Sequence, residues 1–367
     1  MSRIDATQPP FRAEVIGSLL RPRSLKDAAA AGAESHAAAL EREIARVVAK
    51  QEELGFRVVT DGELGRTSWF GFFFEGLDGI RLAPSQFRFR DADGGSYEWP
   101  TCVAAQKLRR RAPITLAEYE RVKRLVRTAL PKATLPTPSA FHFFRFTAAF
   151  DPQAYADASD YFDDLVAIYR SELDELVKAG CRYVQMDEVP VAMLCDPLVR
   201  EQTQAQGGDP DALLDLYISV IRRILEGRPS GVTVGMHLCR GNFRGRWMAS
   251  GGYEPVARKL FNDFPVDVYF LEYDSQRAGD FAPLRHVPDD RHVVLGLVSS
   301  KSPELENVDD LRRRIDEASV HVTLDRLSLS SQCGFASVAG GNLMGEDQQW
   351  AKMALIADTA RRVWGTT

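Results

Sequence analysis

The chain alternates short apolar runs with longer amphipathic segments, and this alternation limits the folds open to it more than any other feature. A short apolar run followed by a helix-like stretch is typical of parallel strands, because two neighbouring parallel strands need a crossover connection between them, usually a helix. The clearest helix is predicted at residues 162–177, where apolar side chains share one stripe and Ala179-Gly180 ends the pattern. The predicted strands lie at residues 13–17, 56–60, 132–137, 182–187, 232–238, 266–272, 291–298 and 324–330.

Eight strands that alternate with helices predict an α/β fold, a closed (β/α)8 TIM barrel. No change of composition marks a linker, so we expect residues 1–367 to form a single barrel domain rather than two smaller domains. Residues 85–112 do not fit the repeat, because Asp93-Gly94-Gly95 lies between alternating segments and predicts an inserted β-hairpin after the second strand. Further helices are predicted at residues 40–54, 213–225, 308–318 and 344–363.

The charge balance argues against a nucleic-acid partner. The 46 Lys and Arg residues face 51 Asp and Glu residues, a formal net charge of −5, and the basic run at residues 107–111 has no interleaved aromatic residues. Five scattered cysteines, an odd number, predict a reduced, cytoplasmic protein. Residues 1–10 lack the apolar core of a secretion signal, and no run reaches the roughly 18 apolar residues of a membrane span, so we expect no membrane association. A homo-oligomer remains open.

Potential metal ligands follow three of the predicted strands, at the ends where a barrel of this kind carries its reactive side chains. His237 and Cys239 are two residues apart at the end of the fifth strand, so both side chains point the same way. Glu272 ends the sixth strand, and Cys333 follows the eighth. Two thiolates, an imidazole and a carboxylate suit tetrahedral zinc. Taken alone, a His-x-Cys pair also fits a packed cysteine beside a histidine that is bonded to the backbone.

Carboxylates follow other strands. Glu63 follows the second strand and Asp187 ends the fourth. Acidic residues at a barrel mouth indicate a second metal site, a general acid and base pair, or a binding site for a cationic group such as an amine. Ion pairs with Arg66 or Arg240 are the alternative. The aromatic cluster at residues 69–74 is more typical of a core than of a cofactor platform, and no glycine-rich phosphate loop or nucleophile elbow is found.

The order of these motifs resembles the catalytic half of cobalamin-independent methionine synthase over nearly the whole chain. The resemblance implies a Zn²⁺ ion held by His237, Cys239, Glu272 and Cys333. It also implies that the substrate homocysteine is bound by residues among Ile16, Gly17, Ser18, Glu63 and Asp187. The matching segments are Ile16-Gly17-Ser18, Asp61-Gly62-Glu63 with Arg66, residues 74–79, Asp187-Glu188, His237-x-Cys239, Glu272 and Gln332-Cys333-Gly334.

The resemblance implies a zinc-dependent methyltransferase whose partners are homocysteine and a methyl donor, a methyl-folate or another compound, and whose product is methionine. A free thiol titrates near about 8.5, and coordination to a metal favours the thiolate, which is the nucleophile that attacks the methyl group. Two alternatives remain. One is thiol addition of the kind performed by epoxyalkane:coenzyme M transferases, and the other is a non-catalytic barrel that zinc stabilises. A sulfonated thiol calls for arginines rather than carboxylates in the pocket.

Three differences from the family concern the methyl donor. Full-length members carry a second, N-terminal barrel that helps to bind a polyglutamylated folate, and 367 residues leave no room for it. The histidine proposed to protonate the leaving group is matched by Lys301, which is therefore the candidate catalytic acid, although a lysine pKa near about 10.4 makes a poor acid unless burial lowers it. Basic residues after the last cysteine are replaced by Phe335-Ala336-Ser337. The hairpin at residues 85–112 is a candidate contact for an acidic donor tail or a neighbouring subunit.

Overall fold

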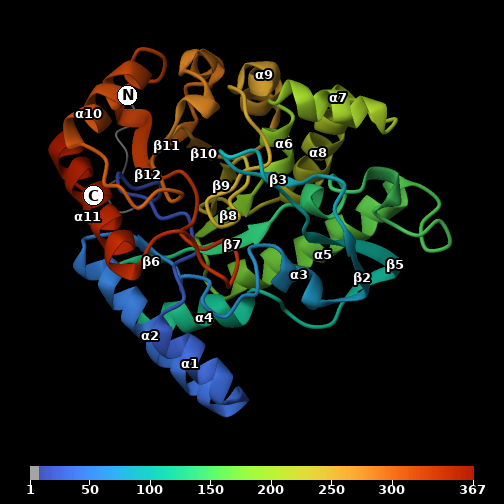
Figure 1. Ribbon diagram of the computed structural model, residues 1–367, viewed down its shortest axis with the longest axis horizontal. Coiled ribbons are helices and arrows are strands. Elements are labelled where there is room, and N and C mark those ends of the chain that lie inside the picture. Colours follow the sequence, from blue (N-terminus) through green and yellow to red (C-terminus); the bar gives the residue numbers. More distant parts are fainter. Residues whose placement is uncertain (1–7) are drawn as a thin grey trace.

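The computed structural model describes residues 8–367, and its centre is a parallel β-sheet (Figure 1). Six strands pair side by side in their order along the chain, and every neighbouring pair is parallel. Nearly all their residues are buried, as expected for a sheet covered on both faces, and the predicted α/β class is confirmed. The strands are β7 (Ala133–Pro136), β8 (Tyr183–Asp187), β9 (Thr233–Leu238), β10 (Val268–Glu272), β11 (His292–Val298) and β12 (Leu327–Ser331).

Two segments lie at the ends of this sheet. β1 (Val58–Val59) runs parallel to β6 (Leu130–Pro131), which leads almost directly into β7. The run at residues 13–17 was predicted as a strand, but it makes only one parallel bridge, from Ala13 to Leu329 in β12. Three of its backbone carbonyls, those of residues 15 to 17, are instead bonded to the side chains of Lys132, Gln185 and Thr60. The other seven predicted runs each overlap a strand.

Helices surround the strands, and the five predicted helices are confirmed (Figure 1). Helix α5 begins where the Asp157 side chain accepts a hydrogen bond from the Asp160 backbone N–H. It ends at Lys178, shortly before Gly180, whose φ is +94°. The α-helices are α1 (Arg23–Ala31), α2 (Ala33–Glu53), α3 (Gly71–Glu75), α4 (Leu116–Leu125), α5 (Ala158–Lys178), α6 (Val189–Met193), α7 (Pro197–Ala205), α8 (Pro210–Leu225), α9 (Glu254–Asp263), α10 (Val308–Ser319) and α11 (Glu346–Trp364). The 3-10 helices are η1 (Pro138–Phe141), η2 (Phe146–Ala148), η3 (Gln276–Ala278), η4 (Ala282–His286) and η5 (Leu324–Arg326).

An antiparallel segment lies to one side of the parallel sheet (Figure 1). β2 (Leu77–Pro84) pairs with β5 (Pro100–Arg110), and β3 (Phe89–Arg90) pairs with β4 (Ser96–Tyr97) between them. The first arm therefore precedes the predicted bounds of 85–112. Gly79 interrupts its pattern, since the register shifts there, its φ is +87°, and an added Cβ would lie 2.8 Å from the Gln106 carbonyl oxygen.

The structure bears on the expectations about membrane association and about a secretion signal only for the residues that it describes. Among residues 8–367, no helix is long and apolar enough to cross a membrane. Residues 1–7, which belong to the stretch used to argue against a secretion signal, lie outside the described residues. The five cysteines all lie within the described part and form no disulfide there.

Candidate metal centre

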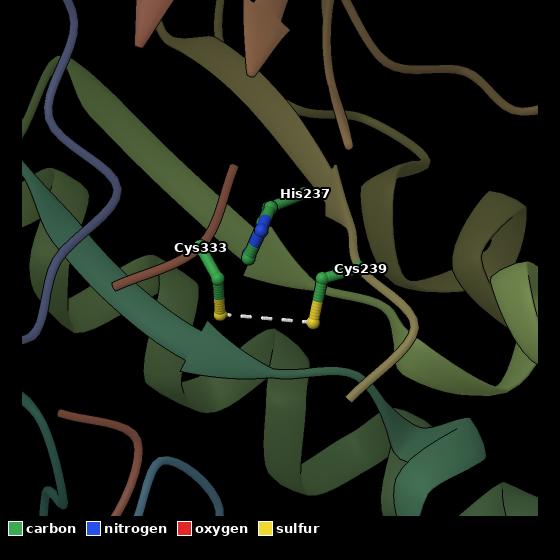
Figure 2. A group of neighbouring side chains, drawn as sticks. All are labelled: His237, Cys239 and Cys333. Carbon is green, nitrogen blue, oxygen red and sulfur yellow. Dashed lines mark hydrogen bonds between the residues drawn. The ribbon is translucent and has the colours of Figure 1, made fainter. Parts of the chain in front are cut away.

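Three of the four predicted metal ligands converge in the structure (Figure 2). His237 lies in β9, Cys239 directly follows that strand, and Cys333 lies in the loop after β12. Their donor atoms are all within 4.8 Å of one another, and all three side chains are buried. The two sulfurs are 3.7 Å apart, which is too far for a disulfide bond. Figure 2 shows that the three side chains point toward one another.

This geometry fits a tetrahedral zinc site. Two sulfurs that each lie about 2.3 Å from one zinc ion at a tetrahedral angle are about 3.8 Å apart. The observed separation of 3.7 Å agrees with that value. Thiolates together with an imidazole select zinc over magnesium or calcium. Three protein ligands leave one tetrahedral position for an exogenous ligand, which is the arrangement of catalytic rather than structural zinc sites.

Asp187 holds the His237 ring in place. The two residues pair in register between β8 and β9, and Asp187 Oδ1 lies 3.1 Å from His237 Nδ1. Gln185 Nε2 donates to the same carboxylate oxygen at 2.8 Å, and His237 Nε2 lies 3.2 Å from the Gln332 carbonyl oxygen. Burial acts to lower the His237 pKa, but hydrogen bonds with Asp187 and Cys333 raise it to about 10. A carboxylate on one ring nitrogen fixes the orientation of a metal-binding histidine.

The two paired sulfurs differ from each other in pKa. The hydrogen bond with Cys333, together with burial, raises the pKa of Cys239 well above its ordinary value. The pKa of Cys333 lies well below its ordinary value, because its sulfur is hydrogen-bonded to Cys239 and to His237, which together outweigh burial. The site therefore favours a thiolate, the form that binds metals. Burial raises the pKa of the remaining three thiols, to about 12 for Cys102 and about 11 for Cys181 and Cys195.

Glu272, the fourth predicted ligand, lies outside the group of three. Its Oε1 accepts hydrogen bonds from Arg277 Nη2 at 2.7 Å and from Lys301 Nζ at 3.3 Å. Its Oε2 accepts one from the backbone N–H of Arg240 at 2.8 Å. Burial acts to raise the Glu272 pKa, but the charges of Lys301, Arg240 and Arg277 lower it to about 2. Lys301, the predicted acid, is thus paired with a buried carboxylate.

Glu63 is held in a constrained conformation beside Arg66. Its φ is +54°, and its backbone N–H donates to Asp61 Oδ1 at 2.8 Å. Its Oε1 lies 3.3 Å from Arg66 Nη1 and accepts a hydrogen bond from Thr134 Oγ1 at 2.9 Å. Burial raises the Glu63 pKa to about 7, with Arg66 opposing the rise and Asp187 adding to it. The ion pair with Arg66 that the sequence left open is therefore present.

A cavity beside the three grouped side chains brings most of the predicted residues together. Its described lining includes the carboxylates of Glu63 and Asp187 and no lysine or arginine, which favours a ligand with an ammonium group. Gly17 is not part of this lining, but an added Cβ there would lie 2.4 Å from Glu63 Oε1, so a larger residue would displace the Glu63 carboxylate. Glu272 and Lys301 are not part of it either. The predicted residues that line the cavity are Ile16, Ser18, Glu63, Asp187, His237, Cys239 and Cys333.

A wider cleft adjoins this cavity, and sequence reasoning missed it. The four phenylalanines of the cluster at residues 69–74 are buried in the core, as predicted. The cluster also supplies part of one wall of the cleft, and the antiparallel segment supplies much of the rest. Arg81 and Arg111 lie at its exposed edge. Its aromatic lining consists of Trp69, Phe70, Phe74, Phe89, Trp99 and Phe243, and it shares Trp69, Phe89, Asn242 and Met248 with the smaller cavity.

Comparisons with known proteins identify the family of this chain. Residues 20–354 match the family described as "Cobalamin-independent synthase, Catalytic domain". The Bacillus subtilis protein YxjH is 41% identical over 97% of this chain and 95% of its own, and a methionine synthase of Pyrococcus furiosus is 22% identical over 89% and 86%. A Listeria monocytogenes structure described as a putative vitamin-B12 independent methionine synthase has a TM-score of 0.75 at 29% identity, over 98% of this chain and 99% of that one. The chain therefore belongs to the cobalamin-independent methionine synthase family and matches its catalytic domain.

Proposed function

We propose that the protein is a zinc-dependent methyltransferase that methylates the thiol of homocysteine and so produces methionine. The observation that carries this proposal is that His237, Cys239 and Cys333 line the same cavity as Glu63 and Asp187. An amino-acid thiol needs both features, metal ligands beside its sulfur and negative charge beside its ammonium group. The free thiols of all five cysteines support a cytoplasmic location.

Different residues of the site bind the metal, the ammonium group and the carboxylate of the substrate. Zinc bound by His237, Cys239 and Cys333 would favour the thiolate form of the substrate, which is the nucleophile. We assign the substrate ammonium group to Glu63 and Asp187. Ser18 Oγ and neighbouring backbone groups at Ile16 and Gly17 serve the substrate carboxylate. We keep Glu272 as the fourth metal ligand before the thiol binds, because a hard carboxylate is the donor that a thiolate replaces most readily on zinc.

We further propose that the sheet closes as a single (β/α)8 barrel domain with the antiparallel segment as an insertion. The strand order supports closure, as does the bridge from Ala13 to Leu329 in the last strand. On the other side of the first run, Thr60 Oγ1 donates to the Gly17 carbonyl at 2.8 Å, and the Leu19 N–H donates to the Gly62 carbonyl at 2.8 Å. A barrel mouth gathers the carboxyl ends of all its strands, which accounts for the convergence of the site residues.

We assign the methyl donor to the wider cleft. Its aromatic walls suit a flat or apolar donor, and because it shares Trp69 and Phe89 with the thiol cavity, the donor lies next to the thiol. Arg81 and Arg111 suit an anionic part of the donor, such as the glutamate tail of a methyl-folate.

The double substitution Arg81→Glu and Arg111→Glu should raise the KM for a triglutamylated methyl-folate by about tenfold while leaving the KM for homocysteine unchanged, because charge reversal at an exposed edge acts on the anionic ligand alone. Steady-state kinetics with each substrate varied in turn measures both constants. Arg88→Glu is the matched control, since Arg88 is exposed on the same antiparallel segment and is not part of the cleft lining. An unchanged donor KM in the double variant would remove the cleft from the proposal.

The zinc X-ray absorption spectrum tests the proposed function directly. The zinc-loaded protein should show two sulfur neighbours, and L-homocysteine should raise the number to three, because its thiolate replaces the Glu272 carboxylate at the fourth tetrahedral position. L-Homoserine, which carries a hydroxyl in place of the thiol, should add no sulfur. A shell that stays at two sulfurs with homocysteine present would contradict thiol activation and favour a zinc ion that only stabilises the fold.

Binding of L-methionine, the proposed product, should strengthen as pH rises toward about 7. Below that pH Glu63 is protonated and uncharged in the free protein, whereas the ligand's ammonium group favours the carboxylate, so binding releases a proton. Affinity therefore rises with pH by up to about tenfold per unit below the Glu63 pKa and levels off above it. Titration calorimetry in two buffers of different ionisation enthalpy counts the proton. The Glu63→Gln variant should lose this dependence, and a flat wild-type profile would contradict the assignment.

A further inference from the structure

We propose that Arg277 is a positioning residue that, together with Lys301, takes the Glu272 carboxylate away from the metal ligands when the substrate thiol binds. The inference rests on the proposed function, because it requires that the thiol and Glu272 compete for one position on the metal. In the structure the carboxylate lies with these two cations, and Oε1 accepts a hydrogen bond from each, at 2.7 Å from Arg277 and 3.3 Å from Lys301.

Glu272 lies next to the metal ligands without joining them. It ends β10, which pairs with β9 in a register that places Phe270 opposite His237. Its Oε2 accepts a hydrogen bond from the backbone N–H of Arg240, the residue that follows the ligand Cys239. The Glu272 side chain has no exposed surface, so its charge must always be balanced by a neighbouring positive group. A bound zinc ion would balance it, as do the charges of Lys301, Arg240 and Arg277, of which Lys301 and Arg277 also bond to the carboxylate through their side chains.

Few groups other than Glu272 contact the Arg277 guanidinium in the described part of the chain. The group lies over the Trp247 ring, 4.8 Å from the ring centre, and Asp274 Oδ1 is 3.8 Å away. Its Nε has no hydrogen-bond partner among residues 8–367. The loop that carries it is fixed at the backbone, since the Arg277 carbonyl accepts a hydrogen bond from the Gly251 N–H at 2.8 Å. The hydrogen bond from Arg277 Nη2 to Glu272 is therefore the strongest polar contact of the Arg277 side chain.

The other cation nearby has a different role. The guanidinium of Arg240 bonds to the backbone carbonyls of Gly251 and Glu272 and to the Tyr253 hydroxyl, so its side chain does not bond to the Glu272 carboxylate. Lys301, in contrast, reaches that carboxylate and lines neither cavity. Lys301, which the sequence suggested as a proton donor, thus bonds to the proposed metal ligand Glu272 instead.

The test compares Arg277→Met with Arg277→Lys in the full chain. In Arg277→Met the cation is gone, so Glu272 should stay bound to the metal. The affinity for zinc without thiol should then rise about tenfold, and the affinity of the zinc-loaded protein for L-homocysteine should fall about tenfold. Effects of this size are typical of residues that bond to metal ligands. Arg277→Lys keeps the charge and should stay close to wild type in both. Competition with a chromophoric chelator measures zinc, titration calorimetry measures homocysteine, and thermal unfolding checks that each variant is folded.

A second substitution separates positioning from mere structure. Adding Glu272→Gln to Arg277→Met should restore homocysteine affinity to that of Glu272→Gln alone, because no carboxylate then competes with the thiol. Weaker zinc binding in Arg277→Met, or no rescue in the double variant, would overturn the inference. If the wild-type protein bound zinc but not homocysteine, the proposed function would fail, while the zinc affinities of wild type and Arg277→Met would still decide whether Arg277 keeps Glu272 from the metal.

Discussion

Replacing Cys239 with alanine should remove zinc from the protein and abolish methyl transfer. Cys239 supplies one of the two sulfurs of the group, and its Sγ lies 3.7 Å from that of Cys333. Changes behind metal ligands already cost about 10- to 100-fold in metal affinity, so loss of a direct thiolate ligand should cost at least about a hundredfold. Competition with a chromophoric chelator measures the affinity, and methionine formation measures the activity.

Cys195→Ala is the matched control for this experiment. Cys195 is as buried as Cys239, at 2% and 4% exposure, but it is not among the grouped metal ligands. Its removal should leave zinc affinity unchanged and should lower the free energy of unfolding by about 1 kcal/mol, the cost of a small cavity. Full zinc retention and normal turnover in Cys239→Ala would exclude the metal centre from the proposed mechanism.

Replacing Glu63 with glutamine should weaken homocysteine binding by a factor of about a hundred or more. The substitution keeps the shape of the side chain but removes its charge, and loss of one partner from a buried ion pair costs about 3 kcal/mol or more. Glu63 is 3% exposed, so water does not replace the lost charge. Titration calorimetry of zinc-loaded protein measures the change.

Two controls show whether the ammonium group is responsible. 4-Mercaptobutyrate keeps the thiol and the carboxylate but lacks the amine, so wild type and Glu63→Gln should bind it equally. Glu118→Gln removes the other carboxylate on Arg66, 2.7 Å from Arg66 Nη2, without touching the cavity lining. It should leave homocysteine affinity near the wild-type value. Equal losses in Glu63→Gln and Glu118→Gln would trace the effect to Arg66, and a preference for coenzyme M would favour the epoxide-type reaction instead.

The sequence was most informative where local periodicity sets the structure. Apolar spacing over residues 162–177 and the stop at Gly180 predicted α5, because both depend on neighbours within one or two turns. Residues 13–17 have the same apolar character as a strand, but side chains distant in sequence bond to their carbonyls. The antiparallel segment likewise begins before its predicted bounds, since Gly79 breaks the alternation within β2. Pairing between distant segments is not encoded in either segment alone.

The sequence by itself determined which chemical groups stand at the strand ends, because strand alternation fixes the side on which His237 and Cys239 emerge. Only the tertiary structure decided which of these groups meet. It brought Cys239 and Cys333 together across 94 residues of sequence and gave Glu272 to Arg277 and Lys301. It also formed the cleft beside the thiol cavity. The physical reason is that a buried charge takes whichever opposite charge the folded chain places nearest, and that choice depends on packing between elements far apart in the sequence.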